Sequence, residues 1–449
     1  MYCLLPLPKD LERIAELFPE EKLLEAARPY YSDDQGRPSE DPLLLLKIMF
    51  LSFFYNIVGD QNTLDTLTYR IDWRQFCGLS LFAPLPDRTT LVKFRRVVGA
   101  AIIHCLFTSF VETLVVKGLI DRTHRFFDGT FAQARAQINP YRDEIYEKPL
   151  AEVEEKIARD HPSETVTLPP ALNPSPVELT KDEYPVNQEA AKARRAEPMK
   201  PVAERHSAGD PDAHFHRGKH GKPSTLGYEH FFSIDSEQLF IEEVDVSKTA
   251  GQGQTIFLEK LKTSEPGQTW SVDMEFSTGE ILEHAEEHEV IVNTSPRPNS
   301  NSGLFPKRHF VYQAETDTYT CPNSKPLSHV STNSKTEDKT YRTEKGTCMT
   351  CPLRELCTTS KSEAGRSITR SKYEAQFERQ REHAQSPEAV MGRVLRGIIS
   401  EGKFAEAARH GLQYMRYVGY TMAQMQGELV ASILNLKRFV RIETAGALA

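Results

Sequence analysis

Apolar residues dominate the first quarter of the chain. Asp41 followed by Pro42 is typical of a helix start, because aspartate accepts a bond from a free backbone amide and proline has a helical φ angle. The next stretch, residues 43–58, is apolar on most faces, which predicts the central helix of a small bundle. A further amphipathic helix is predicted over 62–69. We therefore expect residues 1–120 to be helical.

From residue 121 the pattern changes to strands. The expected elements are, in order, a strand over 124–128, strands over 227–234 and 239–246, a helix over 251–264, a strand over 269–273, and a helix from Thr278. Asp128 and Asp273 each close a strand. This order is that of an RNase H-like fold, in which carboxylates at adjacent strand ends hold divalent metal. It predicts a mixed α/β protein: an N-terminal helical domain, then an RNase H-like mixed-sheet catalytic domain with a loop-rich insertion.

A third carboxylate comes from the late helical region, 387–440. Glu401 lies at helical spacing on one face with a set of apolar residues, which are Val394, Ile398, Ala405, Ala408 and Leu412. A carboxylate in an apolar face is costly unless it is paired or bound to metal. Three carboxylates suit Mg²⁺ or Mn²⁺, and two such ions promote phosphodiester cleavage. We therefore expect Asp128, Asp273 and Glu401 to be catalytic metal ligands.

Each carboxylate also has an ordinary structural explanation. Asp128 precedes a Gly-Thr pair and can be a turn residue. Asp273 can cap the next element. Glu401 can form an ion pair with one of the late arginines, which are Arg393, Arg396 and Arg416.

Composition divides the chain further. We expect a helical domain over 1–120 and the first part of the mixed-sheet core over 121–292. Within the core, residues 145–225 are rich in Glu, Lys, Pro and Ala, which predicts a flexible excursion. Residues 293–387 carry a cluster of cysteines and show little periodicity, and residues 388–449 return to helices of the core.

The cysteine cluster indicates a second metal site. Four of the seven cysteines, Cys321, Cys348, Cys351 and Cys357, fall close together in the sequence and can close a tetrahedral Zn²⁺ site. His329 is an alternative fourth ligand. A set of reduced thiols or a redox pair are the other interpretations. An odd number of cysteines with one cluster is typical of a reducing compartment, so we expect a cytoplasmic protein.

The overall charge limits how the protein binds nucleic acid. The chain of 449 residues has 55 Lys and Arg against 63 Asp and Glu, a net charge of −8, so any nucleic acid must be bound by local basic patches. One patch opens a helix predicted from Thr90, capped by Asp87 or Thr89. The candidate DNA-binding residues are Arg88, Lys93, Arg95, Arg96, Arg217, Lys219, Lys222, Lys403, Arg409 and Arg416. The alternative is that these charges form solvated helix faces.

Several motifs occur together in the order of a known family. They are Gly36–Lys47, Pro86–Arg96, Phe127–Thr130, Asp210–His230, Cys348–Cys357, Ser400–Leu412 and Asn435–Phe439. With these motifs the chain resembles the DDE transposases of bacterial insertion sequences, in the branch with an N-terminal helical domain and a cysteine-bearing insertion. It departs from that family in having Met274-Glu275-Phe276 after the second aspartate, in having no lysine at Ala408 and in having no arginine at Val418.

The resemblance implies an enzyme with the triad Asp128, Asp273 and Glu401. Such an enzyme uses Mg²⁺ or Mn²⁺ to cut DNA at the terminal inverted repeats of its own element, and then joins the freed end to target DNA. It acts on DNA rather than on a membrane, and as a homodimer that holds two DNA ends. Two alternatives are a degenerate relative that only binds DNA, and a nuclease on the same scaffold that cuts without joining.

Overall fold

The structure is a computed structural model that describes residues 7–31, 40–135, 207, 209–216, 225–249, 251–297 and 304–446. The chain divides into two compact units. The first unit contains residues 1–256 and 398–449, and the second contains residues 257–397. The excursion predicted over 145–225 lies outside the described residues, apart from 207, 209–216 and 225.

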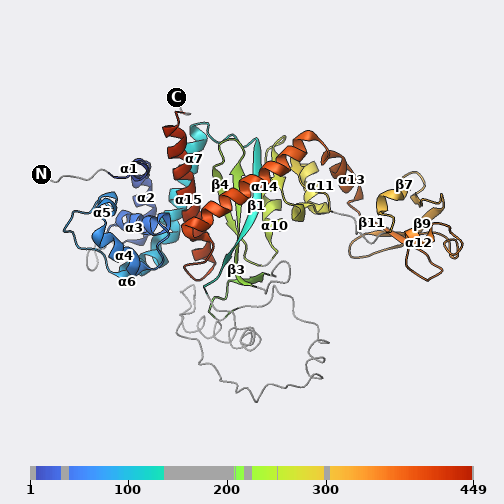
Figure 1. The fold of residues 1–449 in the computed structure, drawn as a ribbon, viewed down its shortest axis with the longest axis horizontal. Coiled ribbons are helices and arrows are strands. Elements are labelled where there is room, and N and C mark those ends of the chain that lie inside the picture. Colours follow the sequence, from blue (N-terminus) through green and yellow to red (C-terminus); the bar gives the residue numbers. More distant parts are fainter. Residues whose placement is uncertain are drawn as a thin grey trace, which may run out of the picture. The chain divides into compact units, whose positions relative to one another are not determined.

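The first unit begins with helices, as the apolar pattern predicts (Figure 1). They are α1 (Lys9–Glu16), α2 (Glu20–Ala27), α3 (Pro42–Phe54), α4 (Asp60–Tyr69), α5 (Ile71–Phe76), α6 (Arg88–Phe94) and α7 (Ala100–Val116), with a 3-10 turn at Arg28–Tyr30 and a π-helical turn at Arg95–Gly99. The Asp41 side chain accepts a hydrogen bond from the Leu43 amide at 2.9 Å, and Asp87 accepts one from the Thr90 amide at 2.8 Å. Both side chains satisfy amides that lack a partner within the helix. The predicted helix starts are therefore confirmed, with Asp87 as the cap of α6.

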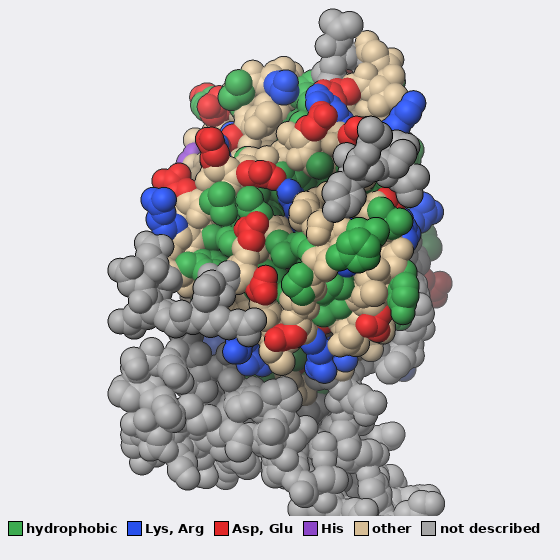
Figure 2. Space-filling view, turned by 90° about the vertical axis from the view of Figure 1, so that its left-hand side faces the viewer, with side chains coloured by type: hydrophobic (Ala, Val, Ile, Leu, Met, Phe, Trp, Pro, Cys, Tyr) green, Lys and Arg blue, Asp and Glu red, His purple; other side chains and the backbone are tan. Residues whose placement is uncertain are grey.

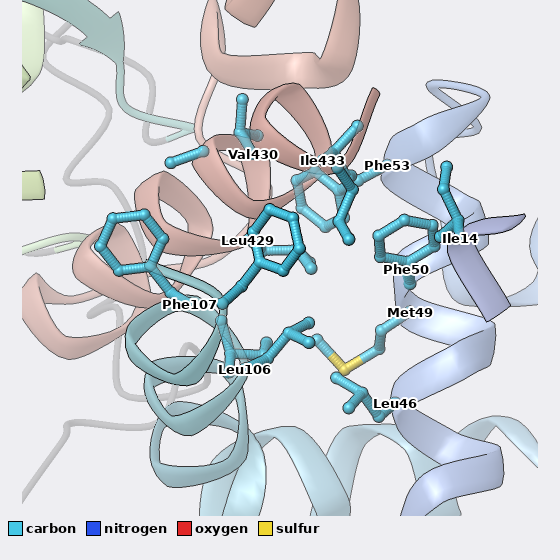
Figure 3. Packing of buried hydrophobic residues seen from close by; sticks show 14 of the residues in the cluster. Ile14, Leu46, Met49, Phe50, Phe53, Leu106, Phe107, Leu429, Val430 and Ile433 are labelled. Atoms are coloured by element: carbon cyan, nitrogen blue, oxygen red, sulfur yellow. The ribbon is translucent and has the colours of Figure 1, made fainter. Parts of the chain in front are cut away.

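The C-terminal helix α15 (Tyr420–Thr444) belongs to the same hydrophobic core as the N-terminal helices. Its side chains pack between those of α3 and α7, as Figure 3 shows for Leu429 and Ile433. At the far end of the helix, Phe439 meets Phe110 edge to face, with ring centroids 5.7 Å apart. Residues from the end and the beginning of the described chain therefore stabilise one another by burying a common apolar surface.

By length and composition alone, the helical stretch 88–116 is apolar enough to cross a membrane. In the structure, 56% of its most apolar window is buried inside the protein. Its buried residues, such as Ile102, Leu106 and Phe110, contribute to the core of the first unit. Hydrophobicity of this stretch is thus accounted for by packing within the fold.

Among its described residues, the first unit also contains four strands. They are β1 (His124–Gln133), β2 (His214–His216), β3 (Thr225–Asp235) and β4 (Ile241–Val246). Strand β3 pairs antiparallel with β1, with β2 and with β4. In this register Asp128 lies opposite Phe232, and β1 continues for five more residues to Gln133. The prediction that Asp128 closes its strand is wrong, and so is the alternative of a turn.

In the second unit, a β–α–β arrangement follows helix α10 (Gly253–Lys262), whose first residues belong to the first unit. The β–α–β arrangement consists of β5 (Thr269–Val272), a 3-10 turn (Met274–Phe276), α11 (Gly279–Glu287) and β6 (Ile291–Asn293). Two further helices of this region are α13 (Glu374–His383) and α14 (Pro387–Ala407). Strands β5 and β6 are parallel, and helix α11 connects them. Thr278 caps α11 by accepting a bond from the Ile281 amide at 3.3 Å. Helix α14 begins in the second unit and continues into the first, where a π-helical turn at Ala408–Leu412 follows it.

The cysteine-bearing stretch contains a five-stranded antiparallel sheet, which the sequence analysis did not predict. Its strands are β7 (Val311–Gln313), β8 (Thr318–Thr320), β9 (Pro326–Thr332), β10 (Lys339–Arg342) and β11 (Ser367–Arg370), in the order β11-β10-β9-β8-β7, and the short helix α12 spans Arg354–Cys357. The core of this sheet is small. Its buried apolar residues are Phe310, Tyr319, Leu327, Tyr341 and Ile368.

The predicted fold class, a mixed α/β protein with N-terminal helices followed by sheets, is confirmed. Along the chain, antiparallel strands are followed by a helix and then by a parallel β–α–β arrangement, which is the succession of elements in an RNase H-like fold. The boundaries of the functional domains stay a prediction. The compact units instead group the N-terminal helices with β1–β4 and α15.

Candidate functional site

Asp128 lies on a strand whose neighbouring residues are tightly fixed. The ring of Phe127 stacks on that of Phe231, with centroids 5.3 Å apart and planes inclined by 5°. A Cβ added at Gly129 would lie 2.7 Å from the Phe231 ring, so only glycine fits beside this ring. The Gly129 amide donates a hydrogen bond to Asp128 Oδ1 at 2.9 Å. The Phe-Asp-Gly motif therefore packs β1 closely while leaving the carboxylate partly exposed.

Asp273 directly follows β5, as predicted. Its side chain makes no capping hydrogen bond to the following 3-10 turn, so the capping alternative is not supported. A buried polar network joins the ends of β5 and β6 to α13. Asn293 donates to Ser271 Oγ at 3.2 Å and contacts His383 Nε2 at 2.7 Å, and Thr294 donates to the Asp273 carbonyl at 2.8 Å. This network fixes the backbone from which the Asp273 side chain projects.

Helix α14 approaches these strand ends closely. A Cβ at Gly392 would lie 2.5 Å from Ser271 Oγ and 2.8 Å from Asn293 Nδ2, so the glycine lets the helix pack against both side chains. One turn further along, Arg396 Nη2 lies 3.6 Å from Asp273 Oδ1. The Asp273 side chain is 50% exposed and that of Arg396 is 18% exposed. The arginine therefore holds a carboxylate that remains accessible to solvent.

Glu401 lies on the same helix as Arg396, on a side that is exposed. Val394 is 52% exposed and Ile398 is 65% exposed, although both were expected on a buried face with Glu401. The buried positions of α14 are small or polar, and they are Ala389, Gly392, Ser400, Lys403 and Ala407. The prediction that Glu401 interrupts a buried apolar face is wrong. Within the described parts of the chain, Glu401 has no ion pair, and the alternative of a structural ion pair is not supported.

The three carboxylates have the donor chemistry that Mg²⁺ and Mn²⁺ prefer, which is charged oxygen with access to water. Asp128 and Glu401 belong to the first unit, and Asp273 belongs to the second. Among the residues that the structure describes, no group of three or more His, Cys, Asp or Glu side chains is arranged to hold a metal ion as it stands. The donor set thus fits a hard cation by its chemistry.

Three of the candidate DNA-binding residues are buried, which does not fit direct contact with DNA. Arg95 forms a bidentate pair with Asp60 at 2.9 Å and lies over the Tyr417 ring. Arg416 donates to the Ile57 carbonyl at 3.0 Å and lies over the Phe53 ring. Lys403 is 7% exposed, and burial lowers its pKa to about 8. Arg95 and Arg416 therefore connect elements of the first unit.

Four candidate cations are exposed, and they are Arg88, Lys93, Arg96 and Arg409. Arg217, Lys219 and Lys222 lie outside the described residues. Arg88 also lines a cavity of about 310 Å³ in the first unit, together with Arg135, Arg95 and Arg416. On the face that carries the N-terminal helices, hydrophobic and acidic side chains occupy the middle, and most Lys and Arg side chains lie toward the edges (Figure 2). Basic character is therefore local, as the net charge predicts.

A second basic cavity was not predicted. It has a volume of about 350 Å³, lies in the second unit, and is lined by the cations Arg297, Lys307, Arg308 and Arg381 together with Tyr312. Lys307 and Arg381 both contact Glu374, at 2.5 Å and 3.3 Å, whereas Arg297 and Arg308 form no ion pair within the described residues. The run Lys307-Arg308-His309 is the sequence signal that could have indicated this cavity. It was not sufficient, because Arg381, which also lines the cavity, is distant along the chain. We name this feature the basic cavity.

Two motif segments have a structural role that sequence reasoning missed. Asp210 is fully buried and accepts hydrogen bonds from Tyr228 Oη at 2.5 Å and from the Gly419 amide at 3.2 Å. Burial raises the pKa of Asp210 to about 6. On α15, Asn435 donates to the Ile241 carbonyl and accepts from the Ile241 amide, both at 2.8 Å. These two side chains attach the C-terminal helix to the strands.

Two segments of the chain match models of transposase families. Residues 1–97 match a transposase domain (DUF772), and residues 320–440 match a transposase DDE domain. The resemblance to DDE-type transposases that the motifs indicate is thereby confirmed. Among solved structures, the chain is similar to a piggyBac transposase synaptic complex with hairpin DNA, at 9% identity and a TM-score of 0.38, over 96% of this chain and 73% of that one.

Proposed function

We propose that this protein cuts DNA at the ends of an insertion sequence and joins the freed ends to target DNA. The observation that carries the proposal is on α14, within the segment that matches a transposase DDE domain. This one helix presents Glu401 as an exposed carboxylate without an ion pair among the described residues, and it also holds Asp273 through Arg396. An exposed acid without an ion pair is more useful for binding a cation than for stabilising a fold.

In this proposal Asp128, Asp273 and Glu401 hold the divalent cations, Mg²⁺ or Mn²⁺. When bound, such ions promote attack by water on the phosphodiester and stabilise the oxygen that leaves. The chain itself supplies fixed orientation: the packing of Phe127 and Gly129 sets the strand that carries Asp128. Arg396 is a positioning residue, because its guanidinium lies 3.6 Å from the Asp273 carboxylate and orients it.

DNA is the proposed partner, and local cations are the proposed contacts. The helical region bears the exposed Arg88, Lys93 and Arg96, which suit phosphate contacts at the terminal inverted repeats. The basic cavity adds Arg297 and Arg308, which are not engaged in ion pairs among the described residues. Because transposition requires two DNA ends to be held together, we propose that a homodimer is the active form on DNA.

The cytoplasm is the proposed location. Six cysteines are described, and all six are free thiols. Free thiols in a cluster are compatible with a reducing compartment, where disulfides do not persist. A location in the same compartment as the DNA also suits the proposed reaction.

The proposed function is tested with duplex DNA that carries the inverted repeat flanking the reading frame. The full-length protein is incubated with labelled end DNA and a circular target, with Mg²⁺, with Mn²⁺, or with a chelator. We expect nicked end DNA and joined product with either metal, and neither with the chelator. Binding without metal-dependent cleavage would identify a DNA-binding relative, and cleavage without joined product would identify a nuclease; either result contradicts the proposal.

A further inference from the structure

The four cysteines of the second unit line one small cavity, although they come from different elements. They are Cys321, Cys348, Cys351 and Cys357, and the volume that they enclose with their neighbours is about 30 Å³. A cavity needs about 10–15 Å³ to hold one water molecule, so this space is large enough for a single ion and too small for an organic ligand. No histidine or carboxylate lines it. We name it the cysteine cavity.

The backbone around Cys321 forms a tight turn that directs an amide toward its sulfur. Cys321 follows β8 and closes a tight turn, in which its amide donates to the Lys325 carbonyl at 2.9 Å. The Lys325 amide lies 3.4 Å from Cys321 Sγ and donates to it. Ser324, inside this turn, has a φ of 53°, an uncommon conformation for a residue other than glycine.

Two of the other three cysteines have side-chain contacts to their sulfur atoms. Asn323 Nδ2 lies 3.5 Å from Cys351 Sγ, and Thr343 Oγ1 lies 3.2 Å from Cys348 Sγ. Two arginines adjoin the cavity: Arg354 donates to the Cys348 carbonyl at 2.8 Å, and Arg366 donates to the Cys357 carbonyl at 2.9 Å. These guanidinium groups can offset the two negative charges that remain when four thiolates surround one divalent cation.

Space for Cys348 is reserved by a glycine. Gly365 has a φ of 65°, and a Cβ added there would lie 2.5 Å from Cys348 Sγ. A larger residue would therefore push the sulfur out of the cavity.

We propose that the cysteine cavity is a site for one structural Zn²⁺ held by four thiolates. Tetrahedral coordination by sulfur, with Zn–S distances of about 2.3 Å, is characteristic of this ion. The described side chains do not stand at metal-holding distances, so binding requires the thiols to lose their protons and turn inward. His329, the alternative ligand, is exposed on β9 and contacts Thr332 Oγ1 at 2.9 Å, away from the cavity lining.

The small sheet explains why a metal is needed here. Its core has only the five buried apolar residues named above, and Cys321 and Cys357 pack against them. A sheet of short strands with so small a core is marginal without a disulfide or a metal. The four described cysteines of this sheet form no disulfide. A zinc ion would join β8, the loop before α12 and the end of α12 into one structure.

The test is the metal content of the full-length protein, purified under reducing conditions. We expect one zinc ion per chain, released when the thiols are blocked by a mercurial. Cys348→Ser and Cys351→Ser should each reduce zinc by more than tenfold, whereas Cys105→Ser, at a half-buried thiol of the first unit, should leave it unchanged. His329→Ala should also leave zinc unchanged.

A second measurement covers the case in which a serine variant fails to fold. Reduced wild-type protein, stripped of metal, is titrated with Co²⁺ alone and then with Zn²⁺ alone. We expect an intense thiolate-to-cobalt absorption of a tetrahedral site at one equivalent, which zinc displaces. Absence of zinc after purification together with no cobalt uptake would overturn the proposal, as would loss of zinc in His329→Ala with retention in Cys321→Ser. Neither readout depends on DNA cleavage.

Discussion

Asp273 and Arg396 form an ion pair within the second unit, with Asp273 Oδ1 3.6 Å from Arg396 Nη2. The aspartate follows a strand and the arginine comes from the middle of α14. Arg396 and Glu401 lie on one helix, five residues apart, which corresponds to a rise of about 7.5 Å. The helix that carries one proposed catalytic acid therefore also orients another.

Replacing this arginine is expected to reduce cleavage without unfolding the protein. An ion pair with a half-exposed carboxylate contributes up to about 1 kcal/mol, so Arg396→Ala should lower the cleavage rate by roughly two- to fivefold. Arg396→Lys should recover part of the rate because it keeps the charge. The half-saturating Mn²⁺ concentration should rise in Arg396→Ala. An unchanged metal dependence with a lower melting temperature would instead indicate a structural role only.

Gly129→Ala should destabilise the strand that carries Asp128. The added Cβ would lie 2.7 Å from the Phe231 ring, and overpacking of this kind costs about 1–3 kcal/mol. Denaturant unfolding of the full chain measures the loss. Phe231→Leu in the same chain should recover part of it by vacating space beside residue 129, and a double variant no more stable than Gly129→Ala alone would contradict the packing argument.

Asp210 should make stability depend on pH in a defined direction. Its folded pKa of about 6 lies above the ordinary value of 3.8, so the folded protein binds this proton more tightly than the unfolded chain. The resulting stabilisation is fully present below about pH 4 and is lost as the pH rises through about 6, a change of at most about 3 kcal/mol.

Asp210→Asn cannot titrate and serves as the reference for this effect. The unfolding free energy of the wild type minus that of the variant should fall as the pH rises from 4 to 6. Chemical denaturation at several pH values across this range measures the difference. A difference that is constant, or that grows with pH, would mean that burial does not raise the pKa of this carboxyl.

The basic cavity should contribute to DNA binding through phosphate contacts. Each phosphate contact adds about 0.9 to the slope of log K against log salt, so Arg297→Ala with Arg308→Ala should reduce that slope by about 2. Arg379→Ala is the control, because this exposed arginine of the same unit is engaged with Glu286 outside the cavity. Equal slopes for the double variant and the control would show that the cavity does not contact DNA.

Local signals in the sequence were sufficient to predict the helices that begin with a capping side chain. Asp41, Asp87 and Thr278 each accept the amide bond that their position predicts, since capping depends on only a few neighbouring residues. Asp128 was misplaced because Gly129 was interpreted as part of a turn. The glycine is required instead by the Phe231 ring, which comes from a strand about a hundred residues later.

Long-range packing also explains the two other differences between the predicted and the observed structure. On α14 the apolar spacing indicated the wrong face, because the buried side is occupied by small and polar residues such as Gly392 and Ser400, which allow close approach. The sheet of the cysteine-bearing stretch escaped prediction because its strands are short and mostly exposed: β9 buries only Leu327 and β10 only Tyr341. Spacing did predict that the four cysteines gather at one place.

The most direct test of the account compares two glutamates of the same helix. Glu401→Gln and Glu388→Gln remove one exposed negative charge each from α14, at a proposed metal ligand and at the first turn. Cleavage of labelled end DNA is measured with Mn²⁺ for both variants and for the wild type, together with DNA binding. We predict a loss of at least 100-fold in cleavage for Glu401→Gln, with binding retained, and wild-type cleavage for Glu388→Gln. Equal cleavage by Glu401→Gln and the wild type would contradict the proposed role of this carboxylate.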